Sequence, residues 1–314
     1  MARPELIDSR AKEAFPRPGL RRFSSDASPA LYDKAFDRAG ELLSACWLRL
    51  EGERSDAVGQ IARLLDLPAG RRGMLVRNSE RLRTWGVLER LVSAARKALA
   101  AEPADAAGAE NLVDLALELA QSIDPVVYPR AHRMDLAARA WGYRARCRQI
   151  QGDMEGAEVA LERSYRCLLE GSRDGWERAV WLELKALLRR EQGRFHEAEA
   201  ALRRATAIFR EIGDDRRAAR CLTDLGEVHR GLGRPKSAAQ YSGQAVALLR
   251  GQEPELLARA LRAQLTSLSA GGRWFEAGRA FAELASLARR HPRLGIPITE
   301  LRLLTYPGPR ALVE

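Results

Sequence analysis

The chain has 314 residues, of which 46% are apolar and only 6% are aromatic. This balance favours helices packed through alanine and leucine and argues against a β-sandwich, whose core needs β-branched and aromatic side chains. The net charge is +10. Nearly all of the chain's positively charged residues are arginines. This composition fits either a GC-rich bacterial genome or a surface for acidic partners.

The first part of the chain changes from a polar segment to helical periodicity. Residues 1–28 are rich in proline, serine and charge, and we expect a flexible basic arm there. Periodicity begins at about residue 29, and Ser55 is expected to cap a second helix. We therefore predict an N-terminal helical cap over residues 29–83, followed by a divergent helix pair over residues 84–123.

From Met134 onward four segments repeat around a glycine. Successive glycines are 41, 40 and 39 residues apart, and an alanine follows five residues after each. The glycine supplies the left-handed conformation that ends a helix, and the alanine lets the next helix pack closely against it. Three of the segments also have a small residue seven positions before the glycine, whereas the fourth has Leu265. The glycines are Gly152, Gly193, Gly233 and Gly272, and the alanines are Ala157, Ala198, Ala238 and Ala277.

These four segments resemble tetratricopeptide repeats. The resemblance implies an all-α fold, an α-solenoid of antiparallel helix pairs forming a superhelix, with four long repeats over residues 134–290. Their spacing exceeds the usual period of about 34 residues, and Leu265 marks the fourth as a degenerate capping repeat. The segment LVRNSERLRTWGVLERL is also similar to bacterial tetratricopeptide proteins that have no established function. The C-terminal tail, residues 291–314, is expected to fold back on the last repeat, dock into another subunit or contact the partner.

The sequence offers no pattern typical of a catalytic or metal site. No two of the four histidines lie three or four residues apart, and the four cysteines form no close pair. Phosphate-binding loops, dinucleotide fingerprints and nucleophile elbows are missing from the sequence. We therefore predict no enzyme, no cofactor and no metal. Since no secretory leader or long apolar stretch occurs, we expect a cytoplasmic protein without membrane contact.

The resemblance also implies a working surface, because tetratricopeptide arrays bind with the concave face formed by the first helix of each pair. Aligned inner positions hold seven arginines against two glutamates. The favoured prediction is a non-catalytic scaffold or adaptor that binds an acidic segment of a protein partner in an arginine-lined groove. The alternative is that these arginines are solvated or paired with acidic residues one helix over. The predicted partner-binding residues are Arg139, Arg146, Arg190, Arg220, Arg230, Arg259 and Arg262.

Two other functions stay open. Residues 60–78 have the rhythm of a helix-turn-helix, in which Arg71, Arg72 and Arg77 would face nucleic acid in a transcriptional regulator. The segment has few side chains that read base edges, and a helical cap explains it as well. An adaptor in a bacterial signalling or defence operon is a third hypothesis, which rests on the family resemblance alone. The oligomeric state is left open.

Overall fold

The computed structural model describes residues 29–101 and 103–305, and all regular elements in these ranges are helical. The expected basic arm, residues 1–28, and Tyr306 of the tail lie outside the described residues. Two compact units make up the chain, Met1–Gly52 and Glu53–Glu314. The second unit holds all of the predicted repeats.

The long helix α2, Pro29–Leu65, passes from the first unit into the second. The prediction that Ser55 begins a new helix is wrong, because the helix continues through this residue. Gly52 does not interrupt it, since each interior glycine costs only about 1 kcal/mol relative to alanine. In the first unit the apolar side chains of Phe36 and Trp47 are exposed.

The residues that follow α2 form short helices and then an antiparallel pair. Thr84 begins α4 by accepting a hydrogen bond from the Val87 amide at 3.3 Å, and Asp105 begins α5 in the same way with Gly108 at 2.8 Å. Their hydrophobic faces share one core with the end of α2 and with α6. The elements are α3 Ala69–Asn78, η1 Glu80–Leu82, α4 Trp85–Ala100 and α5 Ala106–Ser122.

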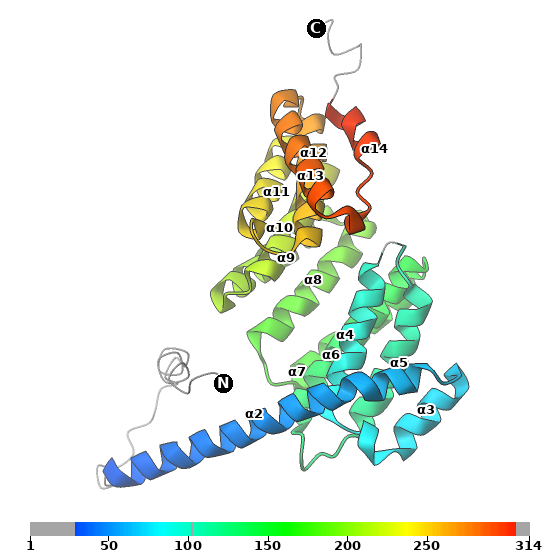
Figure 1. Cartoon of the computed structure of the whole chain (residues 1–314), viewed down its shortest axis with the longest axis vertical. Coiled ribbons are helices and arrows are strands. Elements are labelled where there is room, and N and C mark those ends of the chain that lie inside the picture. The colour runs from blue at the N-terminus through cyan, green and yellow to red at the C-terminus, as the bar shows by residue number, and fades with distance from the viewer. Residues whose placement is uncertain (1–28, 102, 306–314) are drawn as a thin grey trace, which may run out of the picture. The chain divides into compact units, whose positions relative to one another are not determined.

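Four further helix pairs follow in chain order, as Figure 1 shows by colour from green to red. The two helices of each pair pack on each other. The first helices are α6 Arg130–Ile150, α8 Gly175–Glu191, α10 Asp215–Gly231 and α12 Pro254–Ala270. The second helices are α7 Met154–Glu170, α9 Phe195–Ile212, α11 Pro235–Leu249 and α13 Trp274–Arg290.

The turn within each of these pairs has the conformation predicted from the sequence. Gly152, Gly193, Gly233 and Gly272 all have positive φ values, of 84°, 72°, 69° and 69°. The alanine five residues after each glycine is fully buried, as expected for a close contact between the paired helices. The predicted all-α solenoid of antiparallel helix pairs is therefore confirmed.

The C-terminal segment lies against the last helix pair. It contains η2 Pro292–Leu294, α14 Ile298–Arg302 and η3 Leu303–Thr305. Leu301 is buried in the core formed with α12 and α13, and the hydroxyl of Ser269 donates to the carbonyl oxygen of Leu304. Of the three expected arrangements, the described part of the tail adopts the one in which it folds back on the last pair.

Candidate partner-binding site

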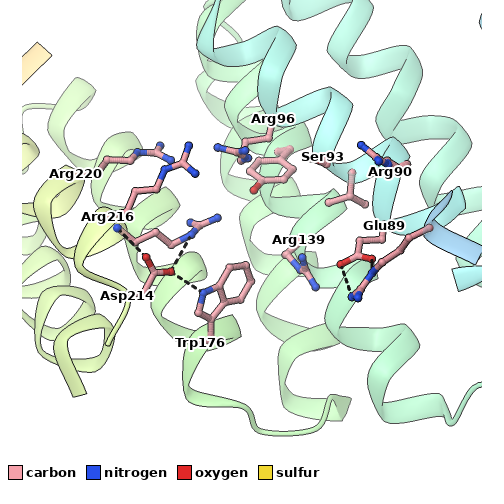
Figure 2. Close-up of a pocket in the computed structure, with 13 residues that line it drawn as sticks. Glu89, Arg90, Ser93, Arg96, Arg139, Trp176, Asp214, Arg216 and Arg220 are labelled. Carbon is pink, nitrogen blue, oxygen red and sulfur yellow. Dashed lines mark hydrogen bonds and ion pairs between the residues drawn. The ribbon is translucent and has the colours of Figure 1, made fainter. Parts of the chain in front are cut away.

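A cavity of 460 Å³ lies along the first helices of successive pairs, α4, α6, α8 and α10. Seven arginines and two carboxylates line it, together with one tryptophan and one tyrosine (Figure 2). This composition makes it a strongly basic cavity with aromatic walls. The lining residues are Arg54, Glu89, Arg90, Val92, Ser93, Arg96, Arg139, Tyr143, Trp176, Asp214, Arg216, Arg217 and Arg220.

The positions of the arginines follow from helix periodicity. Arg90, Ser93 and Arg96 are spaced by three residues on α4, so they lie on one face of that helix. Leu88 and Leu91 of the same helix are fully buried in the core. On α10, Arg216, Arg217 and Arg220 belong to the first two turns, which places them at one end of the helix.

Trp176, in the first turn of α8, makes cation–π contacts with two guanidinium groups. The Arg217 guanidinium carbon lies 4.5 Å from the centre of the indole ring and that of Arg139 lies 5.0 Å from it. The indole nitrogen Nε1 donates a hydrogen bond of 3.1 Å to Asp214. Asp214 also accepts from the Arg217 amide at 3.0 Å and so begins α10. These contacts tie α6, α8 and α10 together along the cavity wall.

Carboxylates neutralise most, but not all, of the cavity's arginines. Neither Arg90 nor Arg96 forms a hydrogen bond or ion pair with another described residue, whereas the other five arginines have carboxylate partners. The ion pairs are Arg54–Glu89 at 2.7 Å, Arg139–Glu177 at 2.9 Å, Arg216–Glu253 at 2.7 Å, Arg217–Glu183 at 2.9 Å and Arg220–Glu183 at 3.0 Å.

Burial and neighbouring charges shift the pKa values of two residues in and beside the cavity. Burial lowers the pKa of Arg96, and the nearby charges of Arg220, Arg217 and Arg216 lower it further, with Tyr143 opposing. Burial also raises the pKa of Glu177 to about 7, although Arg139 opposes this change. Glu177 is therefore only partly ionised near neutral pH and offsets less positive charge than an ordinary glutamate.

The seven predicted partner-binding arginines differ in whether they line the cavity and in whether they form ion pairs. Arg139 and Arg220 line the cavity. Four of the seven are paired with carboxylates on the neighbouring first helix, which is the alternative that the sequence left open. These four pairs are Arg139 with Glu177, Arg220 with Glu183, Arg190 with Glu227 and Arg259 with Asp224 at 2.5 Å.

The other three predicted arginines have no ion pair with a described residue. Arg146 is half-buried on α6, where burial lowers its pKa and Arg190 lowers it further. Arg230 is exposed near the end of α10. Arg262 is half-buried on α12, and its Nε has no hydrogen-bond partner. A partner-binding role for the seven residues stays a prediction.

Sequence reasoning missed the α4 side of the cavity and the start of α10. Arg90 and Arg96 were not assigned to an inner face because their helix pair has no glycine turn on which to align it. Arg216 and Arg217 lie before the positions that the alignment covered. One signal was available: the run Asp214-Asp215-Arg216-Arg217 concentrates charge where a first helix begins.

The segment that resembled a helix-turn-helix is engaged within the protein. Arg72 donates to the carbonyl oxygens of Leu65 and Leu67, at 2.7 and 2.8 Å, and so satisfies the C-terminal end of α2. Arg77 forms an ion pair with Glu118 of α5. Two of the three arginines proposed to face nucleic acid are thus held by protein groups.

Residues 29–101 and 103–305 contain no group of three or more histidine, cysteine, aspartate or glutamate side chains arranged to hold a metal ion. Over the same ranges, no helix combines the length and apolar character needed to cross a membrane.

Comparison with known proteins agrees with the helix pairs. A family model described as "Tetratricopeptide repeat" matches residues 176–251. The crystal structure of BtubC (BKLC) from P. vanneervenii is 18% identical with a TM-score of 0.53, and the match covers 77% of this chain and 91% of that one. A signal transduction ATPase with numerous domains from Pyrococcus horikoshii, which has a tetratricopeptide repeat sensor, is 15% identical with a TM-score of 0.50; the match covers 81% of this chain and 42% of that one.

Both structural likenesses concern the fold alone. No curated protein sequence matches significantly. Tetratricopeptide repeats generally mediate protein–protein interaction and are generally non-catalytic. The family model identifies tetratricopeptide repeats over residues 176–251, and the glycine turns and paired helices show that the neighbouring helix pairs have the same local architecture.

Proposed function

We propose that this chain is a non-catalytic cytoplasmic scaffold or adaptor that binds an acidic segment of a partner protein in the cavity along α4, α6, α8 and α10. The observation that supports the proposal is the lining of this cavity, in which seven arginines accompany two carboxylates. The cavity lies on the first helices, which form the binding face of such arrays.

An acidic peptide segment suits this surface in two ways. Guanidinium groups bind carboxylates through two parallel hydrogen bonds, and such charge-assisted bonds contribute about 1.5–3 kcal/mol each. Arg90 and Arg96 are available for these bonds because neither is paired with another described residue. Trp176 and Tyr143 add aromatic surface against which apolar side chains of the same segment can pack.

The proposal can be tested with labelled peptides. We would measure fluorescence anisotropy of a glutamate-rich peptide, and of the same peptide with glutamine for glutamate, titrated with the full chain. The double variant Arg90→Glu/Arg96→Glu reverses two charges without breaking an ion pair. Its affinity for the acidic peptide should fall by at least about tenfold, since two favourable contacts become repulsive.

A matched control makes the same change in net charge at two arginines on second helices, away from the cavity. Arg204 of α9 and Arg279 of α13 are exposed, and neither has an ion pair with a described residue. The variant Arg204→Glu/Arg279→Glu should bind the acidic peptide like the wild type. Equal losses in both double variants would mean that only the net charge matters, and this result would reject the cavity as the binding site.

A further inference from the structure

The cavity contains a cluster of guanidinium groups contributed by two helices that are far apart in the sequence. Arg96 of α4 and Arg216, Arg217 and Arg220 of α10 line the same space, and we call these four residues the Arg96 cluster. Figure 2 shows the guanidinium groups of Arg96, Arg216 and Arg220 turned toward the same part of the cavity. Their charges act on one another, because those of α10 lower the pKa of Arg96.

Two of the arginines that line the cavity, Arg90 and Arg96, have no carboxylate partner among the described residues. Seven arginines line it, and the ion pairs among the described residues join five of them to five carboxylates. Two of the carboxylates line the cavity, Glu89 and Asp214, whereas Glu177, Glu183 and Glu253 are not among its lining residues. Glu183 forms ion pairs with both Arg217 and Arg220. The folded protein therefore holds like charges together in a partly buried space, which is unfavourable until an anion enters.

The unmatched charge fits a phosphomonoester better than a single carboxylate. A phosphorylated side chain carries a charge of about −1.5 to −2 at pH 7 and has three strong acceptor oxygens. Several guanidinium groups can bind these oxygens at once, each by a two-pronged contact. The hydroxyl of Ser93, one turn before Arg96 on the same face of α4, adds a further donor.

We propose that the Arg96 cluster binds the phosphate of a phosphorylated side chain within the partner's acidic segment. The inference rests on the proposed function and narrows it, because phosphorylation of the partner would then control binding. Arg96 is the decisive residue: it has no ion pair with a described residue, so its guanidinium group is free to receive the phosphate. Arg216 and Arg220 approach the same phosphate from α10.

The test uses the full chain and three versions of one glutamate-rich peptide, with phosphoserine, glutamate or serine at the central position. The phosphoserine peptide should bind at least about tenfold more tightly than the glutamate peptide, because it gains charge and one acceptor oxygen. Equal affinities for these two peptides would overturn the phosphate inference and leave the proposed function intact. Inorganic phosphate and free phosphoserine should compete only weakly for a site that also holds the surrounding segment.

Variants of Arg96 give the second measurement. Arg96→Ala should remove most of the preference for phosphoserine over glutamate. Arg96→Lys should keep part of it, because lysine keeps the charge but lacks the planar, two-pronged donor geometry of the guanidinium group. Arg279→Ala, on a second helix, should keep the full preference. An unchanged preference in Arg96→Ala would overturn the assignment. The unfolding midpoint of each variant, measured alongside, shows whether a lost preference reflects lost structure.

Two further outcomes separate this inference from the proposed function. If free phosphoserine binds in an Arg96-dependent manner while none of the peptides does, the cluster is a site for a small phosphomonoester and the acidic-segment function fails. If a single-stranded RNA of the same net charge binds more tightly than the phosphoserine peptide, the cavity takes phosphodiesters, and the inference of a phosphoprotein partner is overturned.

Discussion

Arg139 of α6 and Glu177 of α8 form an ion pair of 2.9 Å, with both side chains largely buried. Oε2 of Glu177 is also buried and accepts no hydrogen bond. Burial raises the pKa of this carboxyl to about 7; Arg139 opposes the rise, and Asp135 and Asp174 add to it. The ion pair that joins two first helices is therefore sensitive to pH in the neutral range.

The first prediction concerns stability against pH. Between about pH 4.5 and 7, folded Glu177 keeps a proton that the unfolded chain releases. The contribution of this residue to the free energy of unfolding therefore falls as pH rises through this window, and it is constant above it. Glu177→Gln cannot ionise and lacks this fall. Relative to the wild type, the variant should gain on the order of 3 kcal/mol between pH 4.5 and 8. Urea unfolding at both pH values measures this, and a difference independent of pH would refute the assignment.

The second prediction distinguishes arginines that stabilise the fold through ion pairs from arginines that are available to a partner. Arg190 of α8 is an ion-pair partner of Glu227 and lies 3.9 Å from the buried Asp224. Burial raises the pKa of Glu227, Asp224 raises it further, and Arg190 opposes the rise. Arg190→Met would leave these carboxylates without that partner and should lower the free energy of unfolding by on the order of 3 kcal/mol.

The exposed Arg230 serves as the control for Arg190. Arg230→Met should change the free energy of unfolding by less than about 0.5 kcal/mol, because the side chain has no ion pair with a described residue. Equal effects of the two substitutions in thermal or urea unfolding would contradict a structural role for Arg190. The expected result would remove Arg190 from the set of partner-binding candidates.

The third prediction concerns the contact between α2 and α4. A Cβ added at Gly86 would clash with the carbonyl oxygen of Glu53, which belongs to the backbone and cannot move aside easily. Gly86→Ala should therefore lower the unfolding midpoint strongly, by the equivalent of about 2–3 kcal/mol or more. In contrast, Gly278 lies in α13 with no atom within 4 Å of an added Cβ. Gly278→Ala should stabilise by about 0.5–1 kcal/mol. A tolerated Gly86→Ala would show that the two helices are not in such close contact.

The sequence predicted the features of the fold that depend on local chemistry. The turn glycines could be recognised because a residue in the left-handed conformation is a common way to end a helix before a tight turn, and all four have positive φ. The buried alanines could be recognised for the same reason, since their spacing from the glycine fixes their side of the helix. The uninterrupted α2 was not predicted, because a lone Ser55 after Gly52 is a weak signal that the rest of the helix overrides.

The site was less predictable because it depends on pairing between helices. Counting arginines on aligned positions located Arg139 and Arg220 but could not show that Glu177 and Glu183 neutralise them. Those glutamates come from a different helix, and their geometry depends on how the pairs stack. Arg96 could not be predicted because its helix lacks the repeat signature. It has no ion pair among the described residues, so it is more available to a partner than Arg139 or Arg220.

The location of the bound segment is the central claim, and cross-linking tests it most directly. A glutamate-rich peptide with a photoreactive benzophenone near its centre would be bound to the full chain, irradiated, and the attachment sites mapped by mass spectrometry. We predict attachment to residues of α4, α6, α8 and α10 around the cavity, suppressed by Arg90→Glu/Arg96→Glu and retained in Arg204→Glu/Arg279→Glu. Attachment concentrated on the second helices, or on residues 60–78, would contradict the account.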